Sequence, residues 1–398
     1  HGAAGTIFLR GTGSVGHLWI DSRDATLGSY TPLGQLGADQ VEVDHLHIVG
    51  STAVVTPADD ARIQALSVVI EDGGILTHRP AVVATTEVFS LDLVVEGALS
   101  IGADSGIDVS DRGYPGAYTD GFTTEGASTG YSGGSYGGLG SARSDQIPNW
   151  VYGDYREPTS PGSGGGTLDR SGTGGGVARV RADEIVLNGF VRSNGKLGTS
   201  HWTGAGGSGS GGSIWIETGE LSGSGIIQAN GGPGTGPGAA AVGCGGGGRI
   251  AVYYEDASTF DPDAIESLGG TEGVTGPGSA GTVFLNAVGD EEILRVADGG
   301  RTLAGETPIG LIEDGVIQLG HLVLTGTTVA VPIGNAPVQA RSVVVSGGAV
   351  LSHRAATEDE TFVLDLRVEE SISVDADSTI DVSARGFLRG RTHPNTRE

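Results

Sequence analysis

Hydrophobic and polar residues alternate over short stretches of this 398-residue chain, and turn residues separate the stretches. A period of two residues is typical of β-strands whose two faces differ in environment. No stretch keeps the i, i+3, i+4, i+7 apolar spacing of an amphipathic helix. The pattern predicts an all-β protein with strands such as TIFL (6–9), HLWI (17–20), HLHIVG (45–50), LSVVIE (66–71), LDLVVE (91–96), SIWIE (213–217) and RIAVYYED (249–256).

The expected strands recur at a regular distance. Comparable strands begin near Leu46, Leu66 and Leu91, and again near Leu322, Ser342 and Leu364. A spacing of roughly 20 to 25 residues suits one coil of a parallel β-solenoid, in which stacked coils bury ladders of Val, Ile and Leu. A string of β-sandwiches is the alternative, because it also has many short strands.

A long internal repeat organises the chain. GAAGTIFL from Gly2 returns as GSAGTVFL from Gly278, and SVVIEDGGILTHR from Ser67 returns as SVVVSGGAVLSHR from Ser342. The order predicts a first unit (1–112), a unique central segment (113–277) and a second unit (278–398). Because the sequence begins within a repeat and stops where another central segment would start, we expect a piece of a longer array.

Composition narrows the functional classes. The net charge is −26, which disfavours a nucleic-acid partner, because phosphate binding needs basic clusters. No apolar stretch approaches the ~20 residues of a membrane span, and the single cysteine, Cys244, excludes an internal disulfide. The acidity suits a soluble extracellular protein and one that collects divalent cations.

Glycine is the most unusual feature, with 74 residues, many of them in the central segment. The runs 164–166, 174–176 and 245–248 predict tight turns with positive φ, or loops in which neighbouring backbones approach closely. The stretch GSGGSIWIETGELSGSGIIQANGGPG, followed by CGGGGRIAVYYED and GSAGTVFL, resembles the Gly-rich repeats of very large secreted or surface proteins of bacteria. The resemblance implies a right-handed parallel β-helix with long Gly/Tyr-rich loops, as in pectin-lyase-like proteins and autotransporter-type adhesins. It implies no particular activity.

The stretch 113–160 differs from the rest because it is rich in aromatic residues and poor in aliphatic ones. Long loops inside a compact fold are uncommon unless they have a function, and aromatic faces suit sugar rings. Two interpretations stay open: a recognition loop for a ligand such as a polysaccharide, or a flap that covers one face of the solenoid. The candidate ligand-binding residues are Tyr114, Tyr118, Tyr131, Tyr136, Trp150, Tyr152 and Tyr155.

An enzymatic site is not expected. Arg79 and Arg112 have internal twins at Arg354 and Arg385, and a residue that recurs with each unit is more simply structural. The unique carboxylates Asp154 and Glu157 could form a glycosidase pair, which requires a separation of roughly 5 to 9.5 Å. No Ser-His-Asp or Cys-His arrangement stands out.

Metal binding has one acidic candidate and one histidine candidate. Oxygen ligands suit Ca²⁺, and His45 with His47 on one side of a strand could hold a transition metal. His78 and His353 recur in equivalent positions and predict a hydrogen-bonding role in a core or turn. The acidic candidate consists of Glu255, Asp256, Asp261, Asp263 and Glu266.

These observations predict a non-enzymatic, extracellular structural or adhesive β-solenoid repeat of a large bacterial surface or filament-forming protein. Exposed end coils invite pairing, so we expect end-to-end self-association or stacking on further repeats of the same chain. The alternatives are a carbohydrate-active β-helix, either a polysaccharide binder or a lyase, and a Ca²⁺-dependent adhesive module.

Overall fold

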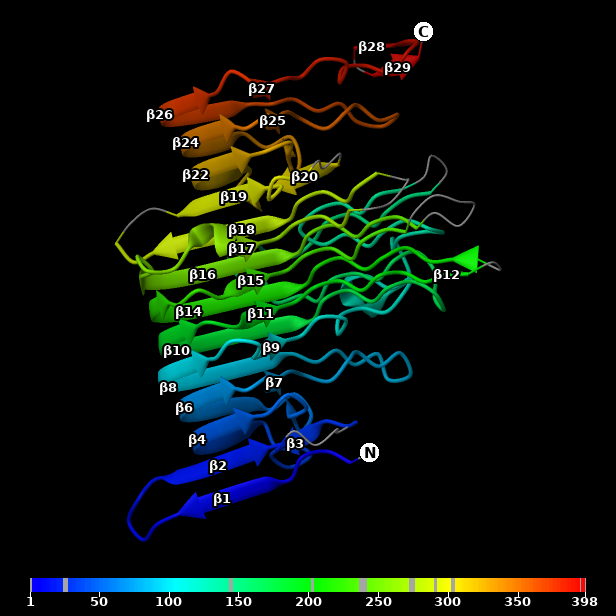
Figure 1. Cartoon of the computed structure of the whole chain (residues 1–398). Helices are drawn as coiled ribbons and strands as arrows, with labels where there is room; N and C mark the ends of the chain where they lie inside the picture. The colour runs from blue at the N-terminus through cyan, green and yellow to red at the C-terminus, as the bar shows by residue number, and fades with distance from the viewer. Residues whose placement is uncertain are drawn as a thin grey trace.

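The computed structural model describes residues 2–23, 28–142, 146–201, 204–235, 242–271, 276–289, 292–301, 305–393 and 395–397, and this part of the chain is nearly all β-structure (Figure 1). Its helical elements are two single turns of 3-10 helix, η1 (Asp120–Phe122) and η2 (Pro262–Ala264). The strands stack one above another from the N-terminal to the C-terminal end (Figure 1). The expectation of an all-β protein is confirmed.

One long sheet runs through the whole stack. Its neighbours are parallel except for two pairs, β1 with β2 and β18 with β19, and the short β21 (Ile312–Glu313) pairs with β22 in antiparallel direction. The spatial order is β1 (Thr6–Arg10), β2 (Gly16–Asp21), β4 (Gln40–Val49), β6 (Arg62–Glu71), β8 (Leu91–Ile101), β10 (Val177–Leu187), β14 (Ser213–Ser222), β16 (Arg249–Asp256), β18 (Thr282–Ala287), β19 (Ile293–Ala297), β22 (Val316–Thr325), β24 (Val338–Ser346) and β26 (Leu366–Val374).

Short strands form a second layer. One parallel sheet contains β3 (Thr31–Leu33), β5 (Val54–Pro57), β7 (Ile75–Leu76), β9 (Gly106–Asp108), β11 (Phe190–Arg192), β15 (Ile226–Gln228) and β17 (Ile265–Glu266), and another contains β20 (Glu306–Ile309), β23 (Val329–Pro332), β25 (Val350–Leu351) and β27 (Thr379–Ile380). Small antiparallel pairs form between β12 (Ser200–His201) and β13 (Gly204–Ala205), and between β28 (Arg391–Thr392) and β29 (Thr396–Arg397).

The chain alternates between the two layers. We call one strand of the long sheet and the short strand that follows it a rung; β8 with β9 is one rung, and β10 with β11 is the next. Within each run of rungs, from β2 to β17 and from β19 to β27, neighbouring rungs pair in parallel, which differs from the antiparallel pairing of the β-sandwiches considered above. The arrangement is compatible with the expected β-solenoid.

Ladders of aliphatic side chains fill the space between the layers. Leu46, Val68, Leu99, Ile185 and Leu221 occupy matching positions on five successive long strands, and each is at most 2% exposed. Burial of one such side chain contributes about 1.5–3 kcal/mol relative to an exposed one. A single rung cannot bury its own apolar face, so stacking of the rungs supplies the core.

The two units have the same order of elements. β1 and β2 are antiparallel in the first unit, as β18 and β19 are in the second, and parallel rungs follow in both. An outward-facing contact also recurs: the ring of His45 lies 2.7 Å from the Ser67 hydroxyl, and that of His321 lies 2.6 Å from Ser342. The duplicated sequence therefore forms duplicated rungs.

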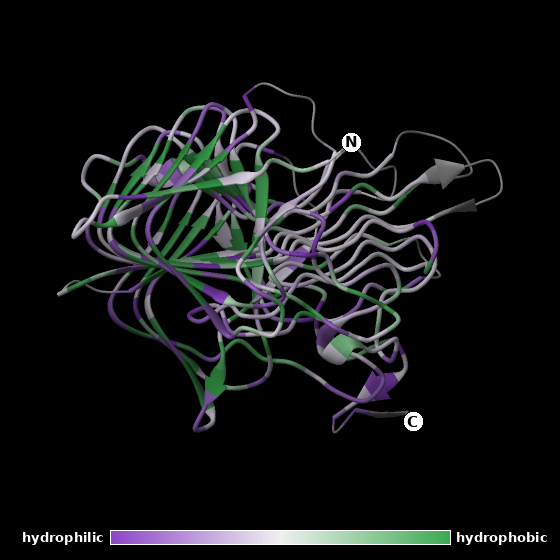
Figure 2. Ribbon diagram, turned by 90° about the horizontal axis from the view of Figure 1, so that it is seen from below, coloured by the Kyte–Doolittle hydropathy of each residue, from purple (hydrophilic) through white to green (hydrophobic). Residues whose placement is uncertain are grey.

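The glycine-rich runs form a third region beside the hydrophobic layers. Their backbones hydrogen-bond to one another, for example from Gly162 N to Gly175 O (2.9 Å) and from Gly211 N to Gly246 O (3.0 Å). Figure 2 shows these pale segments side by side, next to the hydrophobic strands in green. None of the glycines in runs 164–166, 174–176 and 245–248 has positive φ, so the expectation of tight turns there was wrong. The alternative, close approach of backbones, is what the structure contains.

Candidate functional site

The aromatic segment 113–160 leaves the stack after β9 and runs along the glycine-rich region. Its backbone joins that region through bonds such as Gly134 N to Ser208 O (2.8 Å) and Gly138 N to Gly247 O (2.9 Å). A Cβ on Gly134 or Gly138 would overlap the facing carbonyls, so glycine is required for this contact. The segment is thus hydrogen-bonded onto the stack.

The candidate aromatic residues differ in accessibility. Tyr114, Tyr136 and Tyr155 are buried, with exposed fractions of 5%, 0% and 0%. Trp150 is 40% exposed, and the Arg354 guanidinium lies 4.0 Å from its ring centroid. The other candidates, Tyr118, Tyr131 and Tyr152, are half-buried. In this arrangement the three buried rings pack the segment onto the protein and do not present a surface to a ligand.

A buried arginine lies beneath the segment. Arg249 is 2% exposed and donates to the Tyr152 carbonyl (Nε, 3.0 Å) and to Thr282 Oγ1 (Nη1, 3.2 Å). Burial lowers its pKa, and burial raises the pKa of the neighbouring Tyr136 to about 12. The Tyr136 hydroxyl lies 2.7 Å from Ser213 Oγ on β14. These contacts tie the aromatic segment to the long sheet.

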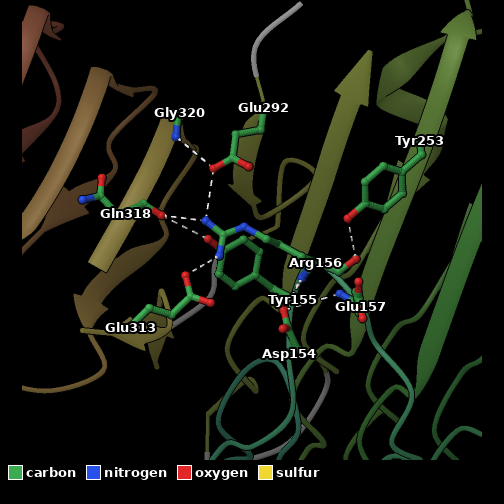
Figure 3. Close-up of polar contacts among 9 residues, drawn as sticks. All are labelled: Asp154, Tyr155, Arg156, Glu157, Tyr253, Glu292, Glu313, Gln318 and Gly320. Carbon is green, nitrogen blue, oxygen red and sulfur yellow. Dashed lines mark hydrogen bonds and ion pairs between the residues drawn. The ribbon is translucent and has the colours of Figure 1, made fainter. Parts of the chain in front are cut away.

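The segment ends in a short stretch, residues 154–157, which we call the strap. It crosses from the central segment to the second unit (Figure 3). The Tyr155 ring packs edge-on against Phe284 at 5.6 Å, and Arg156 Nη2 donates to the Gln318 carbonyl (2.9 Å) and to Glu292 Oε1 (3.2 Å). An aromatic ring and a cation therefore hold the strap on the second unit.

Two further contacts fix the strap. The Tyr253 hydroxyl donates to the Arg156 carbonyl (3.0 Å), and Glu313 lies 3.4 Å from the Arg156 guanidinium. Burial raises the pKa of Tyr155 above its usual range, so the ring stays neutral. The sequence did not predict this contact. The stretch YGDYREP (152–158) has no internal repeat and stands out for that reason, but the sequence does not indicate which residues it contacts.

The carboxylate pair considered for glycoside hydrolysis has a local role in the strap. Asp154 Oδ1 accepts from the backbone amides of Arg156 (2.6 Å) and Glu157 (3.4 Å). The neighbouring Arg156 is held by Glu292 and Glu313. The geometry assigns these groups to the turn and its docking, and enzymatic activity at the strap stays a hypothesis.

Four of the five acidic residues proposed for Ca²⁺, all except Glu255, have separate partners. Asp256 accepts from Ser258 N, Asp261 from Asp263 N, and Glu266 from the Gln228 amide, while Asp263 faces Arg295. In the part of the chain that the structure describes, no three His, Cys, Asp or Glu side chains converge as metal ligands. A Ca²⁺ site at these residues therefore has no geometric support.

The histidines of β4 lie beside a third one on β2. His17 Nδ1 and His47 Nε2 are 3.2 Å apart, and Trp19 stacks on His47 with 4.4 Å between ring centroids. Burial, and then the charge of His17, lower the pKa of His47. His45 faces Ser67, and the three histidine rings form hydrogen bonds and stacks. Among the described residues they do not form a group of three that could hold a metal ion.

The C-terminal rung is open. Ile372 and Val374 on β26 are 49% and 40% exposed, whereas their counterparts on β8, Leu99 and Ile101, are fully buried. The same difference separates β27 from β9: Ile380 is 38% exposed and Ile107 is buried. The positions on β8 and β9 are covered by β10 and β11, which belong to the central segment, whereas no described strand follows β26 in the long sheet.

Comparison with known proteins yields no relatives: no family model, curated protein or solved structure matches the chain. Among the described residues, no helix has both the length and the apolar character to span a membrane.

Proposed function

We propose that this chain is a stacking repeat: a right-handed parallel β-helical segment of a large extracellular bacterial protein, with a mechanical or adhesive role and no enzymatic activity. Rungs extend the hydrogen-bonded ladder in one direction, and the strap fastens the central segment to the unit that follows it. A continuous ladder resists bending, which suits a stalk, spacer or fibre.

The open C-terminal rung is the observation that carries this proposal. Its aliphatic side chains occupy positions that the next rung buries in the first unit, and its strand edge is unpaired. Covering Ile372, Val374 and Ile380 contributes several kcal/mol, on the order of 1 kcal/mol each. A rung built like β10 and β11 fits there by the register that β8 and β10 already use.

Self-association of the full chain tests the proposal. We expect light scattering to show concentration-dependent association, since the open rung is an unsatisfied edge. The double variant Ile372→Glu with Ile380→Glu should remain monomeric at the same concentration, because it places charge on the surface that stacking must bury.

A matched double variant places the same charges elsewhere. Val288→Glu with Ile147→Glu changes two exposed aliphatic residues, 70% and 71% exposed, away from the open rung. It should associate like the unmodified chain. Stacking through this rung is contradicted if the unmodified chain is monomeric at all concentrations. It is also contradicted if both double variants lose association equally. Cleavage of a polysaccharide that is lost on Asp154→Ala would contradict the non-enzymatic part.

A further inference from the structure

The surface of the second unit on which the strap packs, which we call the seat, has a counterpart on the first unit. In the second unit Tyr155 packs in one apolar cluster with Phe284, Leu294, Ile317 and Leu319. The first unit has an aromatic or aliphatic residue at each matching position. They are Phe8, Leu18, Val41 and Val43, and the pairing of Phe8 with Leu18 repeats that of Phe284 with Leu294.

The first-unit seat is uncovered. Phe8 is 59% exposed, whereas Phe284 is 1% exposed beneath Tyr155 and beside β16. A groove of about 440 Å³ lies there, and Leu18, Val41 and Val43 are among its lining residues. These residues are half-buried, and their counterparts in the second unit are buried.

The anion that holds Arg156 also has a counterpart, on a different strand. In the second unit Glu292 Oε1 accepts from Gly320 N at 3.2 Å and binds Arg156. In the first unit the residue types are exchanged: Asp44 Oδ2 accepts from Gly16 N at 2.6 Å. Gly16 occupies the position of Glu292, and Asp44 that of Gly320, so a carboxylate lies at the same junction of two neighbouring strands in both units.

The rest of the groove is also suited to a cation. Glu42 and Glu96 line it together with Asp44, and Arg10 is the one basic residue in its described lining. An arginine that enters this groove can form charge-assisted hydrogen bonds to these carboxylates. The groove therefore offers an apolar floor for a ring and an acidic wall for a guanidinium.

We propose that this first-unit groove binds a second copy of the segment 150–158, presented by another central segment of the same kind. Its tyrosine packs on Phe8 and Leu18, and the arginine that follows binds Asp44 and Glu42. The inference deepens the proposed function, because it names a second contact by which successive units hold together. It depends on side chains remote from the open C-terminal rung.

A peptide with the sequence WVYGDYREP (150–158), carrying an N-terminal fluorophore, tests the inference with the full chain. We expect saturable binding in a fluorescence-anisotropy titration. Peptides with Ala in place of Tyr155 or Arg156 should bind at least tenfold more weakly. A peptide with Lys at the arginine should be intermediate, since Lys lacks the planar fork of donors.

Chain variants locate the site. Glu42→Gln with Asp44→Asn should weaken peptide binding at least tenfold while keeping the fold, because Asn can still accept from Gly16 N. The matched control, Asp365→Asn with Glu369→Gln, removes two carboxylates from the second unit and should bind the peptide normally. Equal binding of a scrambled peptide, or equal affinity in both variants, overturns the inference.

The Ile372→Glu with Ile380→Glu chain separates the two proposals. It should bind the peptide with unchanged affinity although it does not stack. If the unmodified chain binds the peptide but does not self-associate, the groove inference stands and the stacking proposal is overturned. If the unmodified chain self-associates but does not bind the peptide, only the groove inference is overturned.

Discussion

His78 shows how one residue joins the first unit to the central segment. Its ring is fully buried; Nδ1 donates to the Arg79 carbonyl (2.7 Å), and Nε2 accepts from Val177 N on β10 (3.2 Å). The two contacts require the neutral ring with its proton on Nδ1. Burial is the main cause that lowers the pKa of His78 to about 3, and the nearby charge of Arg112 adds to it.

Low pH should weaken the contact that His78 makes between the first unit and the central segment. The pKa of His78 in the folded state lies below the ordinary value of 6.5. Between these two pKa values the imidazole binds a proton in the unfolded chain but not in the folded chain. The contribution of neutral His78 to the free energy of unfolding is fully present above pH 6.5. It is lost as the pH falls toward 3, and the total loss is at most about 4–5 kcal/mol. Chemical denaturation between pH 7.5 and pH 4.5 measures the loss, which should be smaller in His78→Asn. His321 lies on the outer face and serves as the control. If His321→Asn reduced the pH-dependent loss of unfolding free energy as much as His78→Asn does, the assignment of this loss to His78 would be contradicted.

At the scale of elements, alternation predicted the long strands because their two faces differ. Leu46 and Ile48 face the core and His45 and His47 face outward, so the sequence shows the period of β4 directly. The glycine-rich segments show no such period, because their contacts are made by backbone groups and short serine side chains and not by an apolar face. The strap was missed for another reason: Tyr155 binds Gln318, 163 residues away, and no local pattern names so distant a partner.

A methyl group should disturb the glycine-rich region. A Cβ on Gly174 would overlap the Gly162 carbonyl, and Gly174 N already bonds Tyr114 O at 3.0 Å. Gly174→Ala should therefore lower the free energy of unfolding by about 1–3 kcal/mol. The control is Gly102→Ala, where the nearest atom, Ile70 O, is 3.5 Å from the added Cβ. Denaturant titrations compare the two, and equal losses would contradict the packing argument.

For the whole molecule, net charge opposes the association proposed for the open rung. The chain has 48 acidic and 22 basic residues, so each stacked molecule brings a net charge of −26 close to another. Such repulsion acts over the Debye length, which falls from about 30 Å at 0.01 M salt to about 8 Å at 0.15 M.

Salt should therefore promote stacking. Raising NaCl from about 0.01 M to 0.15 M shortens the range of repulsion without weakening apolar contacts. The apparent mass from sedimentation should rise over this interval for the unmodified chain and stay monomeric for Ile372→Glu with Ile380→Glu. Association that weakens with salt would show that ion pairs, and not apolar side chains, join the molecules.

The exchange between Asp44 and Glu292 has an evolutionary consequence. Aligned column by column, the two units differ twice at this point, with glycine against glutamate and aspartate against glycine. In space the negative group has hardly moved, since each carboxylate accepts from the amide of the glycine opposite it. Repeat units of this kind can change their residue types and still keep a carboxylate at the same place. The sequences of such units can therefore diverge while the position of an arginine-binding group is retained.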